Sequence, residues 1–518
     1  MQYKLPLLTI ITSLLFNACG SSDFKEVDVG GTSGSLKIIG KIEYERVQPL
    51  HNGGSTRLNF NNITTETAKQ ITVEAINSAG DVIASTTTDD NGAYSLTKLP
   101  ENTRLKIRAY AKIFKKNKWD TKVIDNTNGG AQFVLEGSLV STGTHSTRRN
   151  LKAPASTLQA PPFAILDSIY AAMKKVITVD SSVNFPPLNL NWSTNNIAAA
   201  GSVADGQIIT SHFNGENNIY ILGDQQSDTD EYDDHIIIHE WGHYFESKFS
   251  RADSIGGSHQ AGDLSDIRLA FGEGWGNALS GIVTDDPLYF DTYTERGVLK
   301  GWNMNVEHAD RYHPGWFSEA SIQRILYDLY DSEDDEADQL SLGFKPLYDV
   351  LTGPQKTTKA FTSIFSFIDA LKTNNSNERN LIENIITSES IATITDIYGS
   401  NNSPSLYQEL TVGNTLTNIC VDTTNGIGNK LNNHKYVYFT INNSGSKSIN
   451  ITRRSGASSS NPNFQLFKTS PFENILSGES NIRNSEETSY SFSEGDYLLD
   501  IYDISSSGYV CFNVKVSN

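Results

Sequence analysis

The stretch His239-Glu240-Trp241-Gly242-His243, followed by Gly272-Glu273-Gly274-Trp275-Gly276-Asn277, decides what we expect at the centre of this chain. Apolar residues surround the first segment with helical spacing, so His239 and His243 should share one helix face, roughly 6 Å apart along the axis. Residues 269–282 predict a second helix that displays Glu273 and Asn277 one turn apart. Two imidazoles and one carboxylate suit Zn²⁺ and leave one coordination position open. We therefore predict that His239, His243 and Glu273 bind zinc.

Glu240 lies between the two histidines and is not needed as a ligand. A carboxylate at this place can take a proton from a water molecule that the metal activates. The alternative is a buried helix whose histidines are satisfied by neighbouring polar groups. Because a glutamate helix follows, the sequence favours the metal site, with Glu240 as the catalytic base of a hydrolytic reaction.

The segments HEWGH and GEGWGNALS together resemble the gluzincin metallopeptidases, in particular their thermolysin and fungalysin branches. The second motif of that family is G-E-x-x-x-D, and Asn277 stands here in place of the aspartate. The resemblance implies that Asn277 orients a zinc-binding histidine through an amide oxygen that carries no charge. It also implies a zinc-dependent endopeptidase and a central α+β domain of thermolysin type.

A short segment upstream of the histidines resembles the edge strand with which thermolysin-like enzymes bind the main chain of a substrate. An extended peptide would pair beside this strand. The resemblance implies that four residues form the substrate strand: Thr210, Ser211, Phe213 and Asn214.

The proposed chemistry also needs a donor that stabilises the oxyanion of the reaction. His313 is our first candidate, because a predicted helix over 318–331 follows it, and related enzymes place their donor histidine at such a helix entrance. Tyr312 and His308 are the alternatives. His235 lies one turn before the metal-binding histidines, and we expect it beside the site or simply packed, since one zinc ion cannot reach three successive turns.

The first residues predict export. Lys4 precedes an apolar run from Leu5 to Phe16 that is too short to span a bilayer. Cys19 resembles the lipid acceptor of bacterial lipoproteins, which implies a signal peptide over 1–19, a flexible tether over 20–35 and a place in the cell envelope, on the outer membrane or at the cell surface. Secretion without a lipid is the alternative.

The composition fits an exported enzyme of about three domains, because 518 residues exceed what one core covers. Lys and Arg number 41 against 60 Asp and Glu, so the formal charge is -19. A surface of this charge repels phosphate backbones, which excludes nucleic acid as a partner. The expected partners are a protein or peptide substrate and, through the lipid anchor, the membrane. We expect a monomer.

Outside the centre, the pattern is that of β-strands. Residues 36–147 predict a β-sandwich that resembles the transthyretin-like domains of exported peptidases, with a hairpin turn at Asp90-Asn91-Gly92. Helical periods begin at 162–176, and 153–402 is the expected gluzincin domain. Residues 415–518 predict a second β-sandwich, similar to the domains that follow secreted peptidases. Its expected strands are 436–441, 448–452, 464–467, 490–492, 497–502 and 509–516.

Two further expectations concern cysteines and acidic residues. Cys420 and Cys511 both lie in the last domain of an exported chain, so we predict a disulfide between them, with two free buried thiols as the alternative. Acidic runs occur at 224–234 and 331–338, and relatives of the family often bind Ca²⁺ through such carboxylates. The spacing matches no calcium motif, so a solvated acidic loop is the favoured interpretation.

Two other functions remain open from the sequence. The chain could be an anchored adhesin whose catalytic region has lost activity, which the Asn277 substitution invites. It could also be a zinc aminopeptidase, although the Gly-x-Met-x-Asn segment that grips a substrate amine in such relatives does not occur here.

Overall fold

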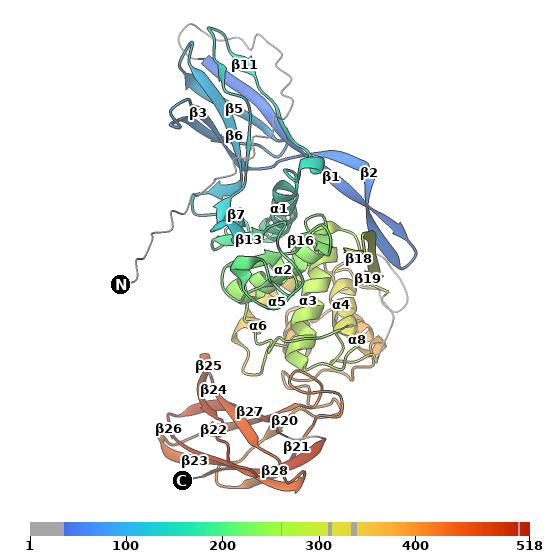
Figure 1. Cartoon of the computed structure of the whole chain (residues 1–518). Helices are drawn as coiled ribbons and strands as arrows, with labels where there is room; N and C mark the ends of the chain where they lie inside the picture. The colour runs from blue at the N-terminus through green and yellow to red at the C-terminus, as the bar shows by residue number, and fades with distance from the viewer. Residues whose placement is uncertain (1–35, 261, 309–312, 333–338, 506–507, 518) are drawn as a thin grey trace, which may run out of the picture. The chain divides into compact units, whose positions relative to one another are not determined.

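Figure 1 shows the computed structural model of the chain, which describes residues 36–260, 262–308, 313–332, 339–505 and 508–517. The predicted signal peptide and tether, with Cys19, lie outside the described residues. The chain divides into two compact units: the first comprises Met1–Gln48, Phe60–Phe114 and Gln132–Asp167, and the second comprises Pro49–Asn59, Lys115–Ala131 and Ser168–Asn518. Among the described helices, none combines the length and the apolarity that a bilayer crossing requires.

The first unit is built from β-strands. They are β1 (Leu36–Asn52), β2 (Ser55–Thr67), β3 (Ile71–Asn77), β4 (Val82–Thr87), β5 (Ala93–Leu99), β6 (Arg104–Lys115), β9 (Val134–Glu136), β10 (Val140–Ser141), β11 (Thr147–Arg148) and β12 (Leu151–Ala153), and the ends of β1 and β2 belong to the second unit. β1 pairs with β5, β11 and β12, whereas β6 pairs with β3, β9 and β10. Buried and half-buried residues alternate along β1 and β6, as in sheets with one covered face.

The predicted hairpin at Asp90-Asn91-Gly92 is wrong. A turn exists there, since the Gly92 amide donates to the Asp89 carbonyl at 3.0 Å. The strands on its two sides do not pair with each other, because β4 pairs with β3 and β5 pairs with β1. The local turn residues reverse the chain, but longer-range contacts select the partner of each strand.

The second unit holds all but the beginning of the helical part of the chain. The helices are α1 (Pro161–Val179), which begins in the first unit and contains the predicted helix 162–176, α2 (Asp234–Phe249), α3 (Ile267–Thr284), α4 (Glu319–Asp328), α5 (Phe344–Thr352), α6 (Pro354–Thr357), α7 (Ile364–Asn374) and α8 (Arg379–Ser388). Its strands before the C-terminal region are β7 (Trp119–Asp125), β13 (Leu188–Trp192), β14 (His212–Phe213), β15 (Asn218–Ile221), β16 (Gly223–Asp224), β17 (Asp228–Thr229), β18 (Leu288–Glu295) and β19 (Val298–Asn305), and β8 (Ala131–Gln132) lies at the boundary of the two units. β14 is the edge strand beside β15.

The expected fold class is wrong. Most of the regular structure is β-strand in several sheets, and no distinct α+β domain of thermolysin type stands out among the described residues. The sheet beside the helices includes β7, which pairs in parallel with β13 although the sequence placed it in the N-terminal sandwich. Ser55 in β2 likewise pairs with Trp302 in β19. Hydrophobic patterns predict strands, but they do not reveal which distant segments pair.

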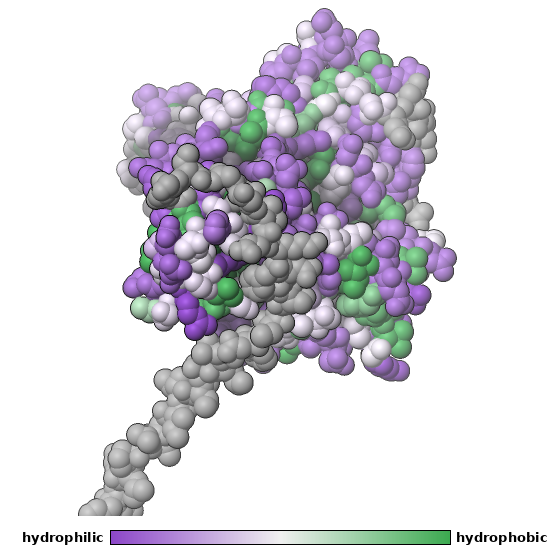
Figure 2. Space-filling view, turned by 90° about the horizontal axis from the view of Figure 1, so that it is seen from above, coloured by the Kyte–Doolittle hydropathy of each residue, from purple (hydrophilic) through white to green (hydrophobic). Residues whose placement is uncertain are grey.

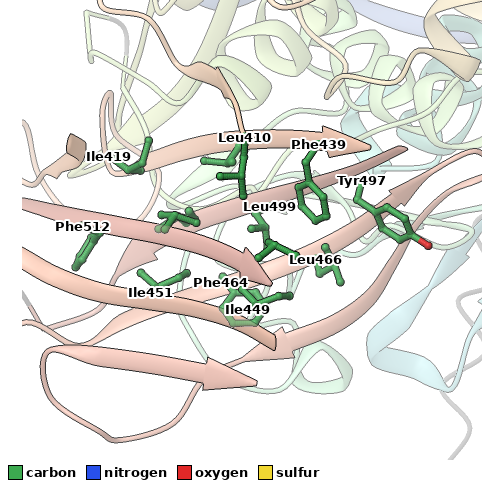
Figure 3. Packing of buried hydrophobic residues seen from close by; sticks show 14 of the residues in the cluster. Leu410, Ile419, Phe439, Ile449, Ile451, Phe464, Leu466, Tyr497, Leu499 and Phe512 are labelled. Atoms are coloured by element: carbon green, nitrogen blue, oxygen red, sulfur yellow. The ribbon is translucent and has the colours of Figure 1, made fainter. Parts of the chain in front are cut away.

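The C-terminal region of the second unit consists of two sheets around one apolar core. The strands are β20 (Tyr407–Glu409), β21 (Thr415–Asp422), β22 (His434–Ile441), β23 (Gly445–Gly456), β24 (Pro462–Thr469), β25 (Phe472–Gly478), β26 (Ser485–Phe492), β27 (Gly495–Asp503) and β28 (Tyr509–Ser517). One sheet has the order β20-β22-β27-β24-β25 and the other β21-β28-β23-β26. Figure 3 shows Phe439, Phe464 and Leu499 among the side chains that fill the space between strands. We call this region the C-terminal sandwich.

The predicted disulfide is confirmed. Cys420 in β21 is bonded to Cys511 in β28, and the two residues lie opposite each other in the antiparallel pair. The bond therefore joins neighbouring strands of one sheet and closes a segment of 91 residues.

The surface shown in Figure 2 is mainly hydrophilic, and its hydrophobic residues lie in small separate groups. This distribution agrees with the formal charge of -19.

Candidate metal centre and cleft

Helix α2 carries the first half of the site. His239 and His243 lie one turn apart, as the sequence predicts, and their Nε2 atoms are 3.1 Å from each other. His239 is buried and His243 half-buried, because α2 packs against α3 along this face. The carboxylate of Asp233, just before the helix, accepts hydrogen bonds from the backbone amide and hydroxyl of Thr292 in β18. This contact fixes the beginning of α2 against β18.

Helix α3 supplies the third group of the site. The Oε2 atom of Glu273 lies 3.2 Å from Nε2 of His239 and 3.4 Å from Nε2 of His243. These three residues form one of two groups of side chains, among the described residues, whose ligand atoms could share a metal ion. The residue types and their convergence fit Zn²⁺, which binds imidazole nitrogen and carboxylate oxygen.

Asn277 determines how His239 presents its ring. The Nδ1 atom of His239 lies 2.7 Å from Oδ1 of Asn277, and the Asn277 amide nitrogen donates to Glu319 at 2.7 Å and to Gln323 at 2.9 Å. These two acceptors turn the amide so that its oxygen faces the imidazole. An amide oxygen only accepts, so Nδ1 of His239 carries the hydrogen and Nε2 keeps its lone pair for a metal.

Two glycines allow the two helices to approach. A Cβ atom on Gly276 would lie 2.8 Å from Nδ1 of His239, and one on Gly242 would lie 3.2 Å from the Cα of Gly276. Both distances are too short for ordinary packing. The glycines in the two sequence motifs therefore bring α2 and α3 close enough for Glu273 to reach the histidines.

The pKa values of His243 and Glu273 show that this group of three side chains favours a bound positive charge. Burial lowers the pKa of His243, but the charge of Glu273 and a hydrogen bond to it outweigh this effect and raise the pKa to about 10. Burial raises the pKa of Glu273, but His243, with hydrogen bonds from its histidine neighbours, holds this pKa well below its usual range. The ionised carboxylate thus attracts a positive charge, which is a proton on His243 when no metal is bound.

Glu240 faces the substrate strand predicted from the sequence. Its Oε2 accepts a hydrogen bond of 2.8 Å from the backbone amide of Phe213 in β14. Within that strand, the Ser211 hydroxyl is turned inward, donating to Asp230 and accepting from the Leu222 amide. Thr210 and Asn214 are exposed at the two ends of the segment.

These residues line one cleft with a volume of about 1130 Å³. It contains His239, Glu240, His243 and Glu273, together with Thr210, Ser211 and Phe213 of the substrate strand. Among the described residues that line the cleft, none is lysine or arginine, and seven carry a carboxylate: Asp228, Asp230, Glu240, Glu246, Glu273, Asp291 and Glu319. The cleft therefore gathers carboxyl groups without a lysine or arginine to balance them, and crowding and burial raise the pKa of several, including Glu246 to about 8.

The candidates for an oxyanion donor do not gather here. His313 is exposed and His308 is exposed, and neither lines the cleft. Tyr312 lies outside the described residues. His235 is almost completely buried, with Nε2 3.1 Å from the Asp286 carbonyl and its ring packed against Phe290. The structure thus places His235 in a packed environment next to α3 and β18, away from the cleft.

Two residues of the site belong to no sequence motif. Glu319 begins α4 and contacts Asn277, and His259 lies in an irregular segment between α2 and α3 with Nε2 3.4 Å from Oε2 of Glu273. Neither belongs to a motif with fixed spacing, because both reach the cleft through the packing of distant segments. The clustering of histidines between positions 212 and 313 is the only hint of His259.

The acidic run at 224–234 is not a solvated loop, so the favoured interpretation is wrong. Asp230 is 3% exposed and Asp233 is 0% exposed. Burial and neighbouring carboxylates raise the pKa of Asp228 to about 7, and burial raises that of Asp291 to about 6. The carboxylates of Asp228, Asp230 and Asp291 form the second group of described residues that could share a cation. Of the second acidic run, residues 333–338 lie outside the described residues.

Comparisons with known proteins leave the family open. No family model matches the chain, and no curated protein matches it. Among solved structures, the pre-peptidase C-terminal domain of a collagenase from Bacillus anthracis matches with 18% identity, a TM-score of 0.17 and coverage of 22% of this chain and 99% of that chain.

Two further solved structures match in the same weak way. The lysozyme inhibitor PliG of Aeromonas hydrophila has 12% identity and a TM-score of 0.15, covering 21% of this chain and 95% of that chain. A β-glucosidase of Paenibacillus barengoltzii has 7% identity and a TM-score of 0.14, covering 92% of this chain and 70% of that chain. All three TM-scores are low, so these likenesses establish neither a family nor a function, and the functional argument stays with the residues of the cleft.

Proposed function

We propose that this protein is a zinc-dependent endopeptidase with a ligand set of gluzincin type, formed by His239, His243 and Glu273. The convergence of their three ligand atoms at 3.1–3.4 Å carries the proposal. Zinc at such a site polarises a carbonyl group and makes water acidic enough to attack it at neutral pH. The experiment that tests the metal is zinc analysis of the purified protein before and after chelation.

In this proposal, protein groups act as the base, bind the substrate backbone and orient His239. Glu240 is the base that accepts the proton of the attacking water and later delivers it to the leaving amine. The peptide lies in extended form beside β14, where the backbone of Thr210 to Asn214 hydrogen-bonds its main chain. Asn277 holds His239 in the tautomer that leaves Nε2 free for the metal.

The test of the base is Glu240→Gln. Glutamine keeps the size of the side chain but cannot accept the proton, so we expect the variant to bind zinc normally and to lose at least about 1000-fold in kcat. Glu101→Gln, at an exposed position of the first unit, is the matched control and should cleave at the normal rate. Undiminished cleavage of an unfolded protein by Glu240→Gln would refute the assigned base.

Two alternatives make different predictions. A surface-anchored adhesin with an inactive site would bind zinc but hydrolyse no denatured protein. A zinc aminopeptidase would release only amino-terminal residues. Mass spectrometry of the products from an unfolded protein separates these outcomes, because internal cleavage sites that disappear on chelation fit the endopeptidase alone.

The proposed place of action is the bacterial cell envelope, with Cys19 lipidated, on the outer membrane or at the cell surface, and the enzyme as a monomer. The support is the sequence of residues 1–19. Labelling cells with a fatty-acid analogue should mark the protein, and Cys19→Ser should abolish the label. An unlabelled wild-type protein in the culture medium would instead indicate secretion without an anchor.

A second, structural cation is supported by three neighbouring aspartates, of which Asp230 is buried and the other two are half-buried. Asp228, Asp230 and Asp291 bring three carboxylates together with no lysine or arginine among the described residues that line the same cleft. Oxygen ligands of this kind suit Ca²⁺. Calcium should raise the melting temperature of the wild-type protein at pH 8, and Asp228→Asn should remove this effect without loss of zinc.

A further inference from the structure

One buried carboxyl group in the cleft has no part in the proposed hydrolysis. Glu246 lies on α2, one turn beyond His243, and is 2% exposed. It nevertheless lines the cleft. A Cβ atom on Gly272 would lie 3.5 Å from Oε2 of Glu246, so the carboxyl group reaches α3 beside the residue that precedes Glu273. The group therefore lies about one helical turn from the candidate metal ligands and borders the same space.

This carboxyl group has no partner within the described part of the chain. No described residue donates a hydrogen bond to it or forms an ion pair with it. The two cationic residues that follow it on the chain are engaged elsewhere. The guanidinium of Arg251 forms an ion pair with Asp253 at 2.9 Å, and the ammonium of Lys248 lies 6.0 Å from the ring centroid of Phe213. A buried carboxyl group is costly without such a partner, which points to a partner that the substrate brings.

The walls near Glu246 leave room for a long side chain. The cleft-lining residues that follow it in the sequence are small, and they are Ser247, Ala252, Ser254 and Gly256. The last three belong to the connection between α2 and α3, whose described part over 251–260 contains no helix or strand. Asn429 of the C-terminal sandwich fixes this connection by donating from Nδ2 to the carbonyls of Gly256 at 2.9 Å and Ser258 at 3.2 Å.

We infer that Glu246 determines substrate specificity by binding the cationic group of a lysine or arginine that lies within two residues of the cleaved bond. The inference rests on the proposed endopeptidase. Residues three apart on a helix have Cβ atoms about 5–6 Å apart, which a long basic side chain of a peptide held beside His243 can span. A cation bonded to a carboxylate in a cleft binds more strongly than a neutral group.

No other cation competes for this position. Among the described residues that line the cleft, none is lysine or arginine. The substrate class that fits the cleft is therefore an unfolded polypeptide rich in basic residues.

The first experiment maps the cleavage sites of the wild-type protein in an unfolded proteome by mass spectrometry. The assay is run at about pH 8.5, because burial raises the pKa of Glu246 to about 8 and most of the carboxyl groups are then ionised. We expect lysine and arginine to be enriched at one fixed position within two residues of the cleaved bond. A preference for apolar residues alone, or none, would overturn the inference without any variant.

The second experiment compares two peptides that differ only at this position, one with lysine and one with norleucine, which has the same stem but no charge. For the wild type, kcat/KM should be about 100-fold higher with lysine. Glu246→Gln keeps the size of the side chain and should remove most of this preference. Glu216→Gln is the control, because Glu216 is exposed and does not line the cleft, and it should keep the full preference.

Two results of this comparison would contradict the inference. If Glu246→Gln slows both peptides equally, Glu246 supports the structure and does not select the substrate. If Glu216→Gln reduces the preference as much as Glu246→Gln, the overall negative charge of the protein is responsible.

A binding measurement separates recognition from hydrolysis. In the Glu240→Gln background, which should bind the peptide without cleaving it, calorimetry gives the Kd of the lysine peptide. Addition of Glu246→Gln should raise this Kd at least about tenfold at equal zinc content. An unchanged Kd would overturn the inference. A wild type that cleaves internal bonds without preferring basic residues defeats the inference alone, whereas a wild type that cleaves none defeats the proposed function as well.

Discussion

The interface between α2 and α3 and the core of the C-terminal sandwich are both shielded from solvent, but they contain different kinds of atoms. Between the helices, imidazole nitrogens and a carboxylate oxygen converge on one point, where they form ion pairs in place of apolar contacts. In the sandwich, alternating apolar residues such as Phe464 and Leu499 fill a common core. The first arrangement favours a cation, and the second favours the folded chain.

Because of this difference, substitutions in the two regions should distinguish effects on activity from effects on folding stability within one compact unit. Substitutions between the helices should change activity and metal binding more than stability. Substitutions in the sandwich should do the reverse, except where it touches the segment that carries His259.

The largest effect is expected for His243→Ala. The variant loses one of three zinc ligands, so we expect no detectable zinc at equimolar metal and a fall in activity of more than about 1000-fold. Its unfolding transition without metal should lie below that of the wild type at neutral pH, because the buried Glu273 carboxylate then loses the charged partner that lowers its pKa. Zinc analysis, kinetics and thermal unfolding check these points together, and full activity would contradict the ligand assignment.

Phe464→Ala is the counterpart in the sandwich. The side chain is 0% exposed, and truncation of a core phenylalanine costs about 3–5 kcal/mol of unfolding free energy. The kcat of the remaining folded protein should not change. Denaturant unfolding measures the cost, and Phe60→Ala, at a position that is 45% exposed, is the control with little expected effect. A loss of kcat in folded Phe464→Ala would mean that the two regions are more tightly coupled than their separate cores suggest.

Asn277→Ala should weaken zinc binding without removing it. The variant loses the acceptor that fixes His239, and loss of such partners lowers metal affinity by about 10–100-fold. Competition with a chelator of known affinity measures the change. Gln323→Ala, which removes only one of the two acceptors that orient the amide, should have a smaller effect. Equal affinities for Asn277→Ala and the wild type would show that the tautomer is fixed in some other way.

The smallest expected effect is a pH dependence of zinc binding. The pKa of His243 is raised to about 10 without metal, so this ring is protonated at neutral pH and must lose its proton to become a ligand. Zinc affinity should therefore increase with pH by about tenfold per unit below this pKa, with about one proton released per zinc. Calorimetry in buffers of different ionisation enthalpy counts the proton. Binding that does not change between pH 6 and pH 8 would contradict the assignment.

The candidate site could be predicted in part because its main ligands follow helical spacing. His239, Glu240 and His243 share one helix, and Glu273 lies on the second helix that the apolar spacing predicts. His259 and Glu319 could not be predicted in this way, since they come from a segment without regular structure and from the beginning of a helix further along the chain.

The fold, too, has features that the sequence predicts and features that depend on contacts between distant segments. By itself, the sequence determined six of the nine described strands of the C-terminal sandwich, the two helices that carry the candidate ligands and the cysteines that pair, because these depend on local periodicity or on a choice between two partners. Only the tertiary structure decided that β7 joins β13, that Asp230 and Asp233 of the acidic run are buried and that His259 lies beside Glu273. Such contacts join residues far apart in the chain. Their stability depends on the packing of the complete fold, and a local sequence pattern does not encode that packing.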